Sequence, residues 1–290
     1  MSLTFLDFFS GIGGFRRGME LAGHKCLGHC EWDKYANASY NAIHNIGVGE
    51  WFGKDIREVR AEELPKADVW CFGFPCQDIS VAGHKTGFGG SRSSLFFTVT
   101  RLIRDTKEEN RPKYLFIENV KNLFSVNRGF DFLKLLIELD EIGYDAEWQL
   151  LNSKDFGVPQ NRERVFIIGH LRGRSGPKIF PITRSNKQTV KQLIGGSQGN
   201  RVYNPDGLSC CLSANGGGRG AKTGLYAINV SRYDCKIRKL TPKECFRLQG
   251  WNDEDFEKVK QVCSDNQLYK QAGNSVTVNV IYEIAKRLES

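Results

Sequence analysis

Short apolar runs alternate with amphipathic stretches from residue 3 to residue 170. Apolar runs of about four to eight residues between turn residues are typical of buried strands, whereas apolar residues spaced three and four apart indicate helices. Strands that alternate with helices predict βαβ units and a mainly parallel sheet. We expect strands at 3–9, 24–31, 69–74, 113–118, 147–151 and 164–170, the last two as a hairpin, a helix ending at 21, and helices at 35–45, 94–105 and 130–142.

The first expected strand leads into a glycine-rich turn, Ser10-Gly11-Ile12-Gly13-Gly14. Such a turn lets a cofactor approach the backbone and points helix N–H groups at it. It is not the dinucleotide fingerprint, because Arg16 stands where the third glycine of G-x-G-x-x-G belongs. Glu31 ends the second strand 20 positions after Gly11, where βαβ units place an acceptor for ribose hydroxyls. Trp32 follows, and its indole could lie against an adenine ring; a helix-start acid and a core aromatic are the alternative.

A single thiol follows the strand expected at 69–74, in Gly73-Phe74-Pro75-Cys76-Gln77. Pro75 cannot donate to a sheet ladder, so the strand should stop there and leave Cys76 at its carboxyl end, where open α/β sheets bind ligands. Residues 77–90 are rich in Gly and Ser, and a loop of about 15 residues is typical of lids and binding loops. Cys76 is therefore a candidate nucleophile under a covering loop, with a buried structural cysteine as the alternative.

Further polar residues should reach the same sheet edge. Glu118 ends the strand at 113–118, and a carboxyl beside a thiolate in a partly dry pocket should have a raised pKa, through like-charge repulsion and desolvation, and could donate a proton. Asp55, before Ile56, ends another strand and could accept from an adenine amino group or cap the next helix. In Gln160-Asn161-Arg162-Glu163-Arg164 alternate residues share a face, so Arg162 and Arg164 form either a pair of anion or carbonyl donors or a charged surface stripe.

Positive charge is concentrated in one region of the chain. The formal net charge of the 290 residues is +8, but residues 171–250 hold 15 Lys and Arg against 3 Asp and Glu, leaving 26 against 30 elsewhere. A local surplus of this kind is typical of a nucleic-acid-binding face, and a solvated basic surface is the alternative.

The same region marks a second domain. From 171 to 236 the periodicity fades and glycines cluster, which indicates a small, loop-rich unit suited to groove readout. A helix should begin at Thr241-Pro242, a favoured cap and first-turn pair, and residues 271–276 lead into a last helix that reaches 288. We expect a catalytic domain of residues 1–175 completed by 266–290, and a target-recognition domain of residues 176–265.

The nine cysteines contain no CxxC pair, and no signal peptide or long apolar run is present, which argues for a reducing cytoplasm and against a membrane protein. His24, Cys26, His29 and Cys30 have the residue types of a metal site but not its spacing, since strand neighbours point to opposite faces. We therefore expect no metal.

Taken in order, these stretches resemble the motifs of the cytosine-C5 DNA methyltransferases. The resemblance covers nearly the whole chain except 171–236, which corresponds to the family's variable target-recognition region. The matching motifs are Asp7-Phe8-Phe9-Ser10-Gly11-Ile12-Gly13-Gly14, Glu31-Trp32-Asp33, Asp55-Ile56, Gly73-Phe74-Pro75-Cys76-Gln77, Arg92-Ser93-Ser94-Leu95-Phe96, Glu118-Asn119-Val120, Gln160-Asn161-Arg162-Glu163-Arg164, Arg238-Lys239-Leu240-Thr241-Pro242 and Gly273-Asn274-Ser275-Val276. The resemblance implies an α/β fold, namely the Rossmann-like sheet of S-adenosylmethionine-dependent methyltransferases with a small loop-rich target-recognition domain.

The resemblance also implies roles for individual residues. Cys76 would add to C6 of a flipped-out cytosine, Glu118 would contact N3 and the exocyclic amine, Arg164 would contact O2, and Arg162 would support the site. Phe9, Gly11, Gly14, Glu31, Trp32, Asp55, Ile56, Pro75, Leu95, Asn274, Ser275 and Val276 would bind S-adenosylmethionine, and Gln77, Ser80, Arg92 and Arg219 would contact DNA. Asp78-Ile79 departs from the Pro-Phe of many relatives.

The implied function is methylation of C5 of a specific cytosine in double-stranded DNA, by a monomer that is either solitary or shares its site with a cognate restriction endonuclease. A relative that acts on RNA, a non-catalytic DNA-binding homologue and a nicotinamide oxidoreductase are the alternatives. Intact Cys76, Glu118, Arg162 and Arg164 argue against the second, and the missing third glycine argues against the third.

Overall fold

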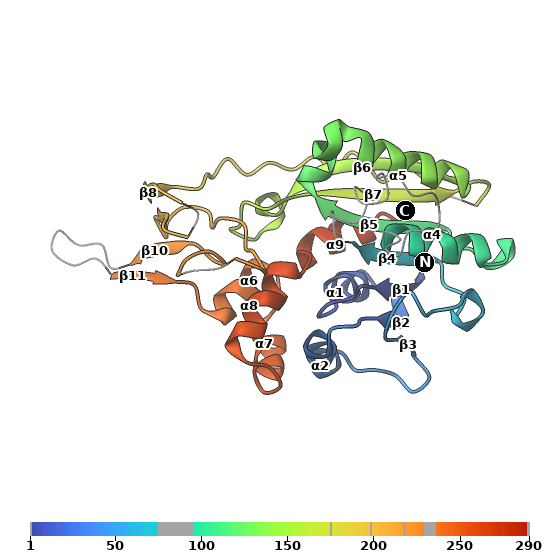
Figure 1. Ribbon diagram of the computed structural model, residues 1–290, viewed down its shortest axis with the longest axis horizontal. Helices are drawn as coiled ribbons and strands as arrows, with labels where there is room; N and C mark the ends of the chain where they lie inside the picture. The colour runs from blue at the N-terminus through green and yellow to red at the C-terminus, as the bar shows by residue number, and fades with distance from the viewer. Residues whose placement is uncertain are drawn as a thin grey trace.

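A seven-stranded sheet with helices on both faces forms the larger part of the molecule (Figure 1). The computed structural model describes residues 2–74, 95–174, 176–197, 199–216, 219–228 and 236–288. The strand order is β3-β2-β1-β4-β5-β7-β6; neighbours from β3 to β5 are parallel, and β7 runs antiparallel to both β5 and β6. The strands are β1 (Thr4–Phe8), β2 (Lys25–Cys30), β3 (Trp51–Gly53), β4 (Val69–Gly73), β5 (Tyr114–Val120), β6 (Tyr144–Asn152) and β7 (Glu163–Leu171).

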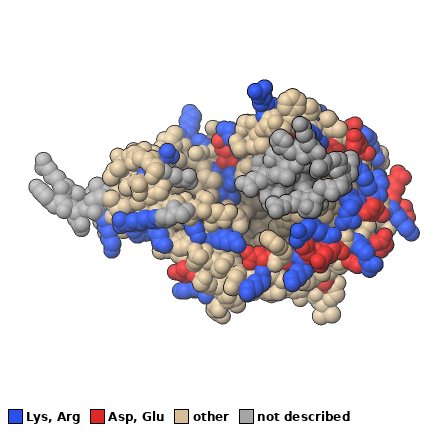
Figure 2. Space-filling model, viewed as in Figure 1, with Lys and Arg blue, Asp and Glu red and all other residues tan. Residues whose placement is uncertain are grey.

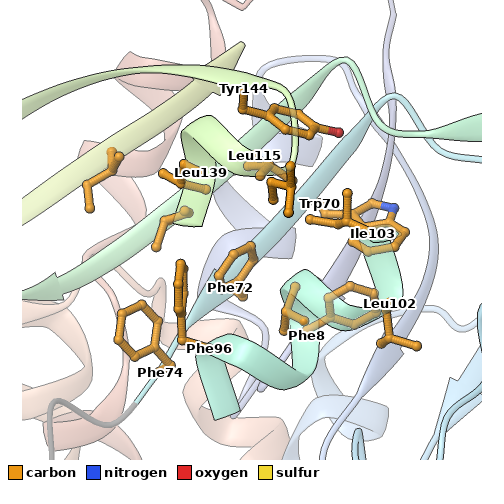
Figure 3. Close-up of a cluster of buried hydrophobic side chains, with 14 of the residues drawn as sticks. Phe8, Trp70, Phe72, Phe74, Phe96, Leu102, Ile103, Leu115, Leu139 and Tyr144 are labelled. Carbon is orange, nitrogen blue, oxygen red and sulfur yellow. The ribbon is translucent and has the colours of Figure 1, made fainter. Parts of the chain in front are cut away.

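Alternate side chains of the central strands enter two separate cores. In β4, Trp70 and Phe72 face one core while Val69 and Cys71 face the other, as the two-residue period of a strand requires. Helices α4 (Leu95–Asp105) and α5 (Phe130–Glu141) cover the first face, and Figure 3 shows Phe96, Leu102 and Ile103 of α4 packed there with residues of the sheet. The strands and helices expected between residues 3 and 170, including the hairpin of the last two strands, are confirmed, except that the strand expected to end at Asp55 ends at Gly53.

The second face is covered by helices from opposite ends of the chain. Helix α1 (Gly14–Leu21) packs on α9 (Val278–Ala285), and a Cβ added at Gly18 would lie 2.6 Å from Cβ of Ile281. The two helices can approach this closely only because residue 18 has no side chain. The C-terminal segment therefore returns to the first half of the fold, as expected.

A second, four-stranded sheet lies beside the first, in the order β11-β10-β9-β8. Its strands are β8 (Gln192–Ile194), β9 (Val202–Tyr203), β10 (Leu225–Ile228) and β11 (Lys236–Lys239). The strands are short and much of the intervening chain is irregular, as the loss of periodicity predicted. The domain boundaries at 175 and 266 stay a prediction.

Three more helices connect this sheet to α9: α6 (Pro242–Leu248), α7 (Asp253–Lys260) and α8 (Asp265–Asn274). Thr241 caps α6 and exchanges hydrogen bonds with Glu244, which confirms the helix start predicted at Thr241-Pro242. The three helices share a core with Ile12 of the glycine-rich turn and Ile43 of α2 (Lys34–Ile43).

Candidate active site

Glu118 lies at the carboxyl edge of the sheet, beside the end of β4. The parallel register of β4 and β5 pairs Gly73 with Glu118. A Cβ at residue 73 would stand only 3.1 Å from Oε2 of Glu118, so glycine leaves the space that this carboxyl occupies. The predicted convergence of the β4 and β5 ends is confirmed.

Arg164 contacts the Glu118 carboxyl directly. It faces Val120 in the antiparallel register of β5 and β7, and its Nε lies 3.1 Å from Oε1 of Glu118. Burial raises the pKa of Glu118, and the cationic Arg164 and Arg162 oppose that shift without cancelling it. The direction is the predicted one, with desolvation as its main cause. A carboxyl in this setting keeps its proton to a higher pH than a solvent-exposed carboxyl does, although it lies against a cation.

Asn119 fixes the chain that leads to Cys76. Its Nδ2 donates to the carbonyl oxygen of Phe74 at 2.8 Å, and Asn119 is buried. The bond ties the end of β4 to β5 two residues before Cys76. The predicted site residues Pro75, Cys76, Gln77, Ser80 and Arg92 lie outside the described residues.

Arg162 is a buried clamp between three segments. Its Nη1 donates to the carbonyl oxygen of Leu212, and its Nη2 donates to those of Gly273 and Ser275 at 3.0 and 2.9 Å. The residue is only 2% exposed. The guanidinium that sequence reasoning grouped with Arg164 therefore joins the sheet to the 212 segment and to the end of α8.

Two residues to which the sequence motifs assigned no role complete this neighbourhood. Sγ of Cys211 lies 3.5 Å from Nη1 of Arg162 and 3.8 Å from Nη2 of Arg164, so it bridges both arginines. Gln160 accepts from the backbone N–H of Leu212 and donates to the carbonyl oxygen of Leu248. Gln160 was visible in its motif, but nothing in the sequence places Cys211 opposite an arginine pair 47 residues away.

The glycine-rich turn and the end of β2 together form a candidate cofactor-binding surface at the carboxyl edge of the large sheet. Oε2 of Glu31 accepts from the backbone N–H of Gly11 at 2.8 Å, which holds the carboxylate against the turn. A Cβ at Gly11 would meet no atom within 4 Å, so the turn is open on that side. Phe9, with φ of 54°, adopts a left-handed conformation that is uncommon for a non-glycine residue and frequent at binding sites.

Trp32 follows the end of β2, beside this surface, and its side chain is 73% exposed. The alternative of a core aromatic is therefore wrong, and the helix cap that follows is Asp33 rather than Glu31. The hydroxyl of Ser10, in the same turn, is buried without a hydrogen-bond partner among the described residues. An open turn, an exposed indole and an unpaired buried hydroxyl fit the adenosyl part of S-adenosylmethionine.

The C-terminal segment closes the other side of the turn. A Cβ at Gly14 would lie 2.7 Å from Cγ2 of Val276 and 3.0 Å from Oγ of Ser275, so these residues pack directly on the start of α1. Asn274 is exposed at the end of α8. The structure thus brings the predicted residues Ser275 and Val276 to the glycine-rich turn.

Three other residues predicted to bind the cofactor lie in different settings. Asp55 accepts from the backbone and guanidinium of Arg57, which favours a turn-capping role. Ile56 is buried in the core, and Leu95, the first residue of α4, is partly buried against it. Asp55 and Ile56 therefore offer less open surface to an adenine ring than Trp32 does.

Basic side chains are spread over the small sheet and its connections. In Figure 2 the charged atoms on that part of the visible face are mainly blue, whereas blue and red mix over the large sheet. Exposed members include Lys187, Lys191, Arg201, Arg219, Lys236 and Lys239. The predicted DNA contact Arg219 is thus on the surface.

Within the described residues, no three His, Cys, Asp or Glu side chains are grouped to hold a metal ion. In the same part of the chain, no helix is both long and apolar enough to cross a membrane.

Comparisons with known proteins give one consistent family. The C-5 cytosine-specific DNA methylase profile matches residues 3–211 and 216–290. The chain is 36% identical to the type II methyltransferase M.HhaI of Haemophilus parahaemolyticus, over 99% of this chain and 94% of that protein. It is 34% identical to the type II methyltransferase M.Bsp6I of Bacillus sp. strain RFL6, over 99% and 98% of the two chains.

Solved structures share the fold at lower sequence identity. The methyltransferase EhMeth of Entamoeba histolytica superposes with a TM-score of 0.75 at 20% identity, covering 99% of this chain and 98% of that one. The Dnmt2 methyltransferase of S. pombe gives 0.72 at 21% identity, covering 98% of both chains.

Proposed function

Because this chain belongs to the C-5 cytosine-specific DNA methylase family, we propose that it transfers a methyl group from S-adenosylmethionine to C5 of a specific cytosine in double-stranded DNA. The observation that carries the proposal is the Glu118 carboxyl, which lies against Arg164 at the carboxyl edge of the sheet. The next residue, Asn119, donates a hydrogen bond to the carbonyl oxygen of Phe74, two residues before Cys76. Family membership supplies the class of reaction, and the contact between Glu118 and Arg164 supports the roles that we propose for these two residues.

Cys76 is the proposed nucleophile. Cytosine C5 is a poor nucleophile, and a bond from the Cys76 sulfur to C6 would make C5 electron-rich enough to accept a methyl group. Loss of the C5 proton and departure of the sulfur would then restore the ring. The Asn119 bond to Phe74 and the small residue at Gly73 support this role, because they direct the chain before Cys76 toward Glu118.

Glu118 and Arg164 would hold the base and stabilise its changing charge. With its raised pKa, the Glu118 carboxyl can be protonated and donate to N3 while its other oxygen accepts from the exocyclic amine. Arg164, which reaches Glu118 through Nε, would direct a guanidinium N–H to O2. Arg162 would act as a positioning residue, since its Nη atoms already donate to three backbone carbonyls.

S-adenosylmethionine, when bound, supplies a methyl group on a positively charged sulfur. In this chain Glu31 would accept from the ribose hydroxyls, and the exposed Trp32 would stack on the adenine. Phe9, Gly11 and Gly14 would line the turn, with Asn274, Ser275 and Val276 beside the methionine part. The rest of the cofactor-binding surface would come from Pro75, Leu95, Asp55 and Ile56.

The DNA would lie between the two sheets, with the target cytosine flipped out of the helix. A base inside a duplex cannot reach a thiol at a sheet edge, and flipping costs a few kcal/mol. The basic surface of the small sheet would bind phosphates, and Arg219 with Gln77, Ser80 and Arg92 would contact the site. A cognate endonuclease acting on the same sequence would fit this function, and the free thiols fit a reducing cytoplasm.

The test is transfer of labelled methyl groups from S-adenosylmethionine to a mixed-sequence duplex and, separately, to tRNA. We expect label in the duplex, located on C5 of cytosine, and none with Cys76→Ala. Cys71→Ala is the matched control, because Cys71 is a buried thiol of β4 outside the proposed site. Label in tRNA alone would overturn the DNA assignment, and full activity of Cys76→Ala would overturn the covalent mechanism.

A further inference from the structure

An ion pair joins two parts of the chain that meet at the cofactor-binding surface. Nζ of Lys270, on α8, lies 2.7 Å from Oδ2 of Asp33, which stands between Trp32 and the first residue of α2. The two side chains are 39% and 23% exposed, so solvent screens the pair only in part. Because the partners are 237 positions apart, the pair ties the segment after β2 to the C-terminal part of the chain.

The two oxygens of the Asp33 carboxylate have different partners. Oδ1 accepts from the backbone N–H groups of Tyr35 and Ala36 and so caps the start of α2. Oδ2 is left for Lys270. Burial acts to raise the pKa of Asp33, but the bonds from Lys270 and from the two N–H groups lower it below its ordinary value. Asp33 is therefore an anion that is held by α2 and by α8 at the same time.

Trp32 stands between two residues that are both anchored. Glu31 accepts from the N–H of Gly11 through Oε2 and from the N–H of Asp33 through Oε1, each at 2.8 Å. The Trp32 side chain itself is mostly exposed, so little protein surface packs against the indole. The backbone on either side must therefore set where the indole lies. Lys270 holds one of those two sides through Asp33.

Helix α8 also carries the other part of the surface. Lys270 and Asn274 are four positions apart and lie on the same side of this helix, and Asn274 is one of the residues proposed beside the methionine part of the cofactor. Gln271 adds a second link to α2, because its Nε2 donates to the carbonyl oxygen of Tyr35 and its Oε1 accepts from Oγ of Ser39, both at 3.0 Å. The helix that leads to the methionine side is thus bonded to the segment that leads from the adenosyl side.

We propose that Lys270 is a positioning residue for cofactor binding: through Asp33 it holds Trp32 where the indole stacks on the adenine. The pair thereby sets how far the adenosyl side of the surface lies from the methionine side. This role rests on the proposed function, because it concerns the same cofactor site. Lys270 acts through Asp33 and not by contact with the reacting atoms, so loss of the pair weakens cofactor binding and leaves the transfer step nearly unchanged.

The experiment is calorimetric titration of the full chain with S-adenosylmethionine and, separately, with S-adenosylhomocysteine, the product that methyl transfer leaves. Lys270→Met keeps the aliphatic stem and removes the charge, and it should raise both dissociation constants about three- to tenfold. Lys270→Arg keeps the charge and should stay within about twofold of the wild type. Only S-adenosylmethionine has a positively charged sulfur, so equal weakening of both ligands separates a positioning role from repulsion between Lys270 and that sulfur.

Two further variants test the route through Asp33. Asp33→Asn keeps a side-chain oxygen for the cap of α2 and removes the charge. It should weaken binding as Lys270→Met does, and the double variant should be no weaker than either single one. Lys243→Met is the matched control, because Lys243 is 33% exposed and pairs with Asp253 and Glu257 outside the cofactor-binding surface. It should leave both dissociation constants unchanged.

The route through Trp32 is tested in a Trp32→Ala background, where Lys270→Met should weaken binding no further. At saturating S-adenosylmethionine the single-turnover rate of Lys270→Met should stay within about twofold of the wild type. Wild-type affinity in Lys270→Met, an equal loss in Lys243→Met, additive losses with Asp33→Asn, or a full further loss in the Trp32→Ala background would overturn the positioning role alone. A wild type that binds neither ligand would overturn the proposed function as well.

Discussion

At the scale of single residues, the proposed site depends on a largely buried carboxyl that lies beside a cation. Burial raises the pKa of Glu118, with Arg164 and then Arg162 acting against that shift. A residue of this kind can donate to the ring nitrogen of a base and accept from its amine at the same time. Conservative substitutions of Glu118 or Arg164 should therefore have the largest effect on the rate of methyl transfer.

Glu118→Gln should lower the rate of methyl transfer by about 100-fold or more, because an amide cannot supply the acidic proton. The wild-type rate should also fall as pH rises through the pKa of Glu118, and the variant should lack this fall. Single-turnover rates across a pH series measure both effects. Glu163→Gln, a neighbouring exposed acid paired with Lys121, is the control and should keep the wild-type profile.

The buried carboxyl of Asp7 gives a second prediction, on how the free energy of unfolding depends on pH. Burial raises its pKa to about 8; its Oδ2 accepts only a 3.3 Å bond from the N–H of Arg16, and its Oδ1 has no partner among the described residues. The folded protein thus holds a proton that the unfolded chain releases near pH 4. The free energy of unfolding should fall as pH rises from about 4 to about 8.

Asp7→Asn should flatten this part of the pH dependence, because an amide does not ionise. Denaturant unfolding at a series of pH values provides the measurement. An identical slope in the variant and the wild type would contradict the assignment to Asp7 and point to Glu31, whose pKa burial also raises.

At the scale of elements, the sequence predicted individual strands and helices better than the contacts between them. Continuous apolar runs such as Val69–Gly73 and the cap at Thr241 are local signals, and both elements formed where expected. Helix α7 was not predicted, because it is mostly charged and buries only Asp255, Phe256 and Val259. For α5 the pattern predicted an amphipathic helix, but which side faces outward depends on Thr100 and Arg104 of another helix.

The contact of α1 with α9 gives a prediction for packing. Gly18→Ala should lower the free energy of unfolding by about 1–3 kcal/mol, because the new methyl would overlap Ile281. Gly47→Ala is the control, since its nearest neighbour is the flexible end of Glu50 at 3.2 Å, and its effect should stay within about 0.5 kcal/mol. Equal effects of the two substitutions in urea unfolding would contradict close packing at Gly18.

At the scale of the whole molecule, the site is made by segments far apart in the sequence. Arg162 donates to carbonyls 111 and 113 positions later, and Cys211 joins it from the small-sheet side. Residue types identified the candidates, but no local pattern encodes such distances. The clamp links the large sheet, the 212 segment and the end of α8, and so couples the proposed base pocket to the part of the chain proposed to read DNA.

The concentration of basic residues predicts how binding responds to salt. Duplex affinity should fall steeply with salt, and Arg219→Glu should weaken binding and reduce the salt slope by about 1. Lys66→Glu, an exposed cation in the large-sheet part of the chain, should change neither. Binding isotherms at several salt concentrations measure both quantities; a flat response would argue against the small sheet as the DNA face.

The most direct measurement of the central claim is capture of the enzyme on a mixed-sequence duplex that contains 5-fluorocytosine, in the presence of S-adenosylmethionine. Because fluorine at C5 cannot leave as a cation, a thiol bonded to C6 should stay attached. We predict a protein–DNA adduct that survives denaturing electrophoresis and is lost in Cys76→Ala but kept in Cys71→Ala. If wild-type protein binds S-adenosylmethionine and methylates normal DNA, yet forms no adduct, the covalent role of Cys76 is contradicted.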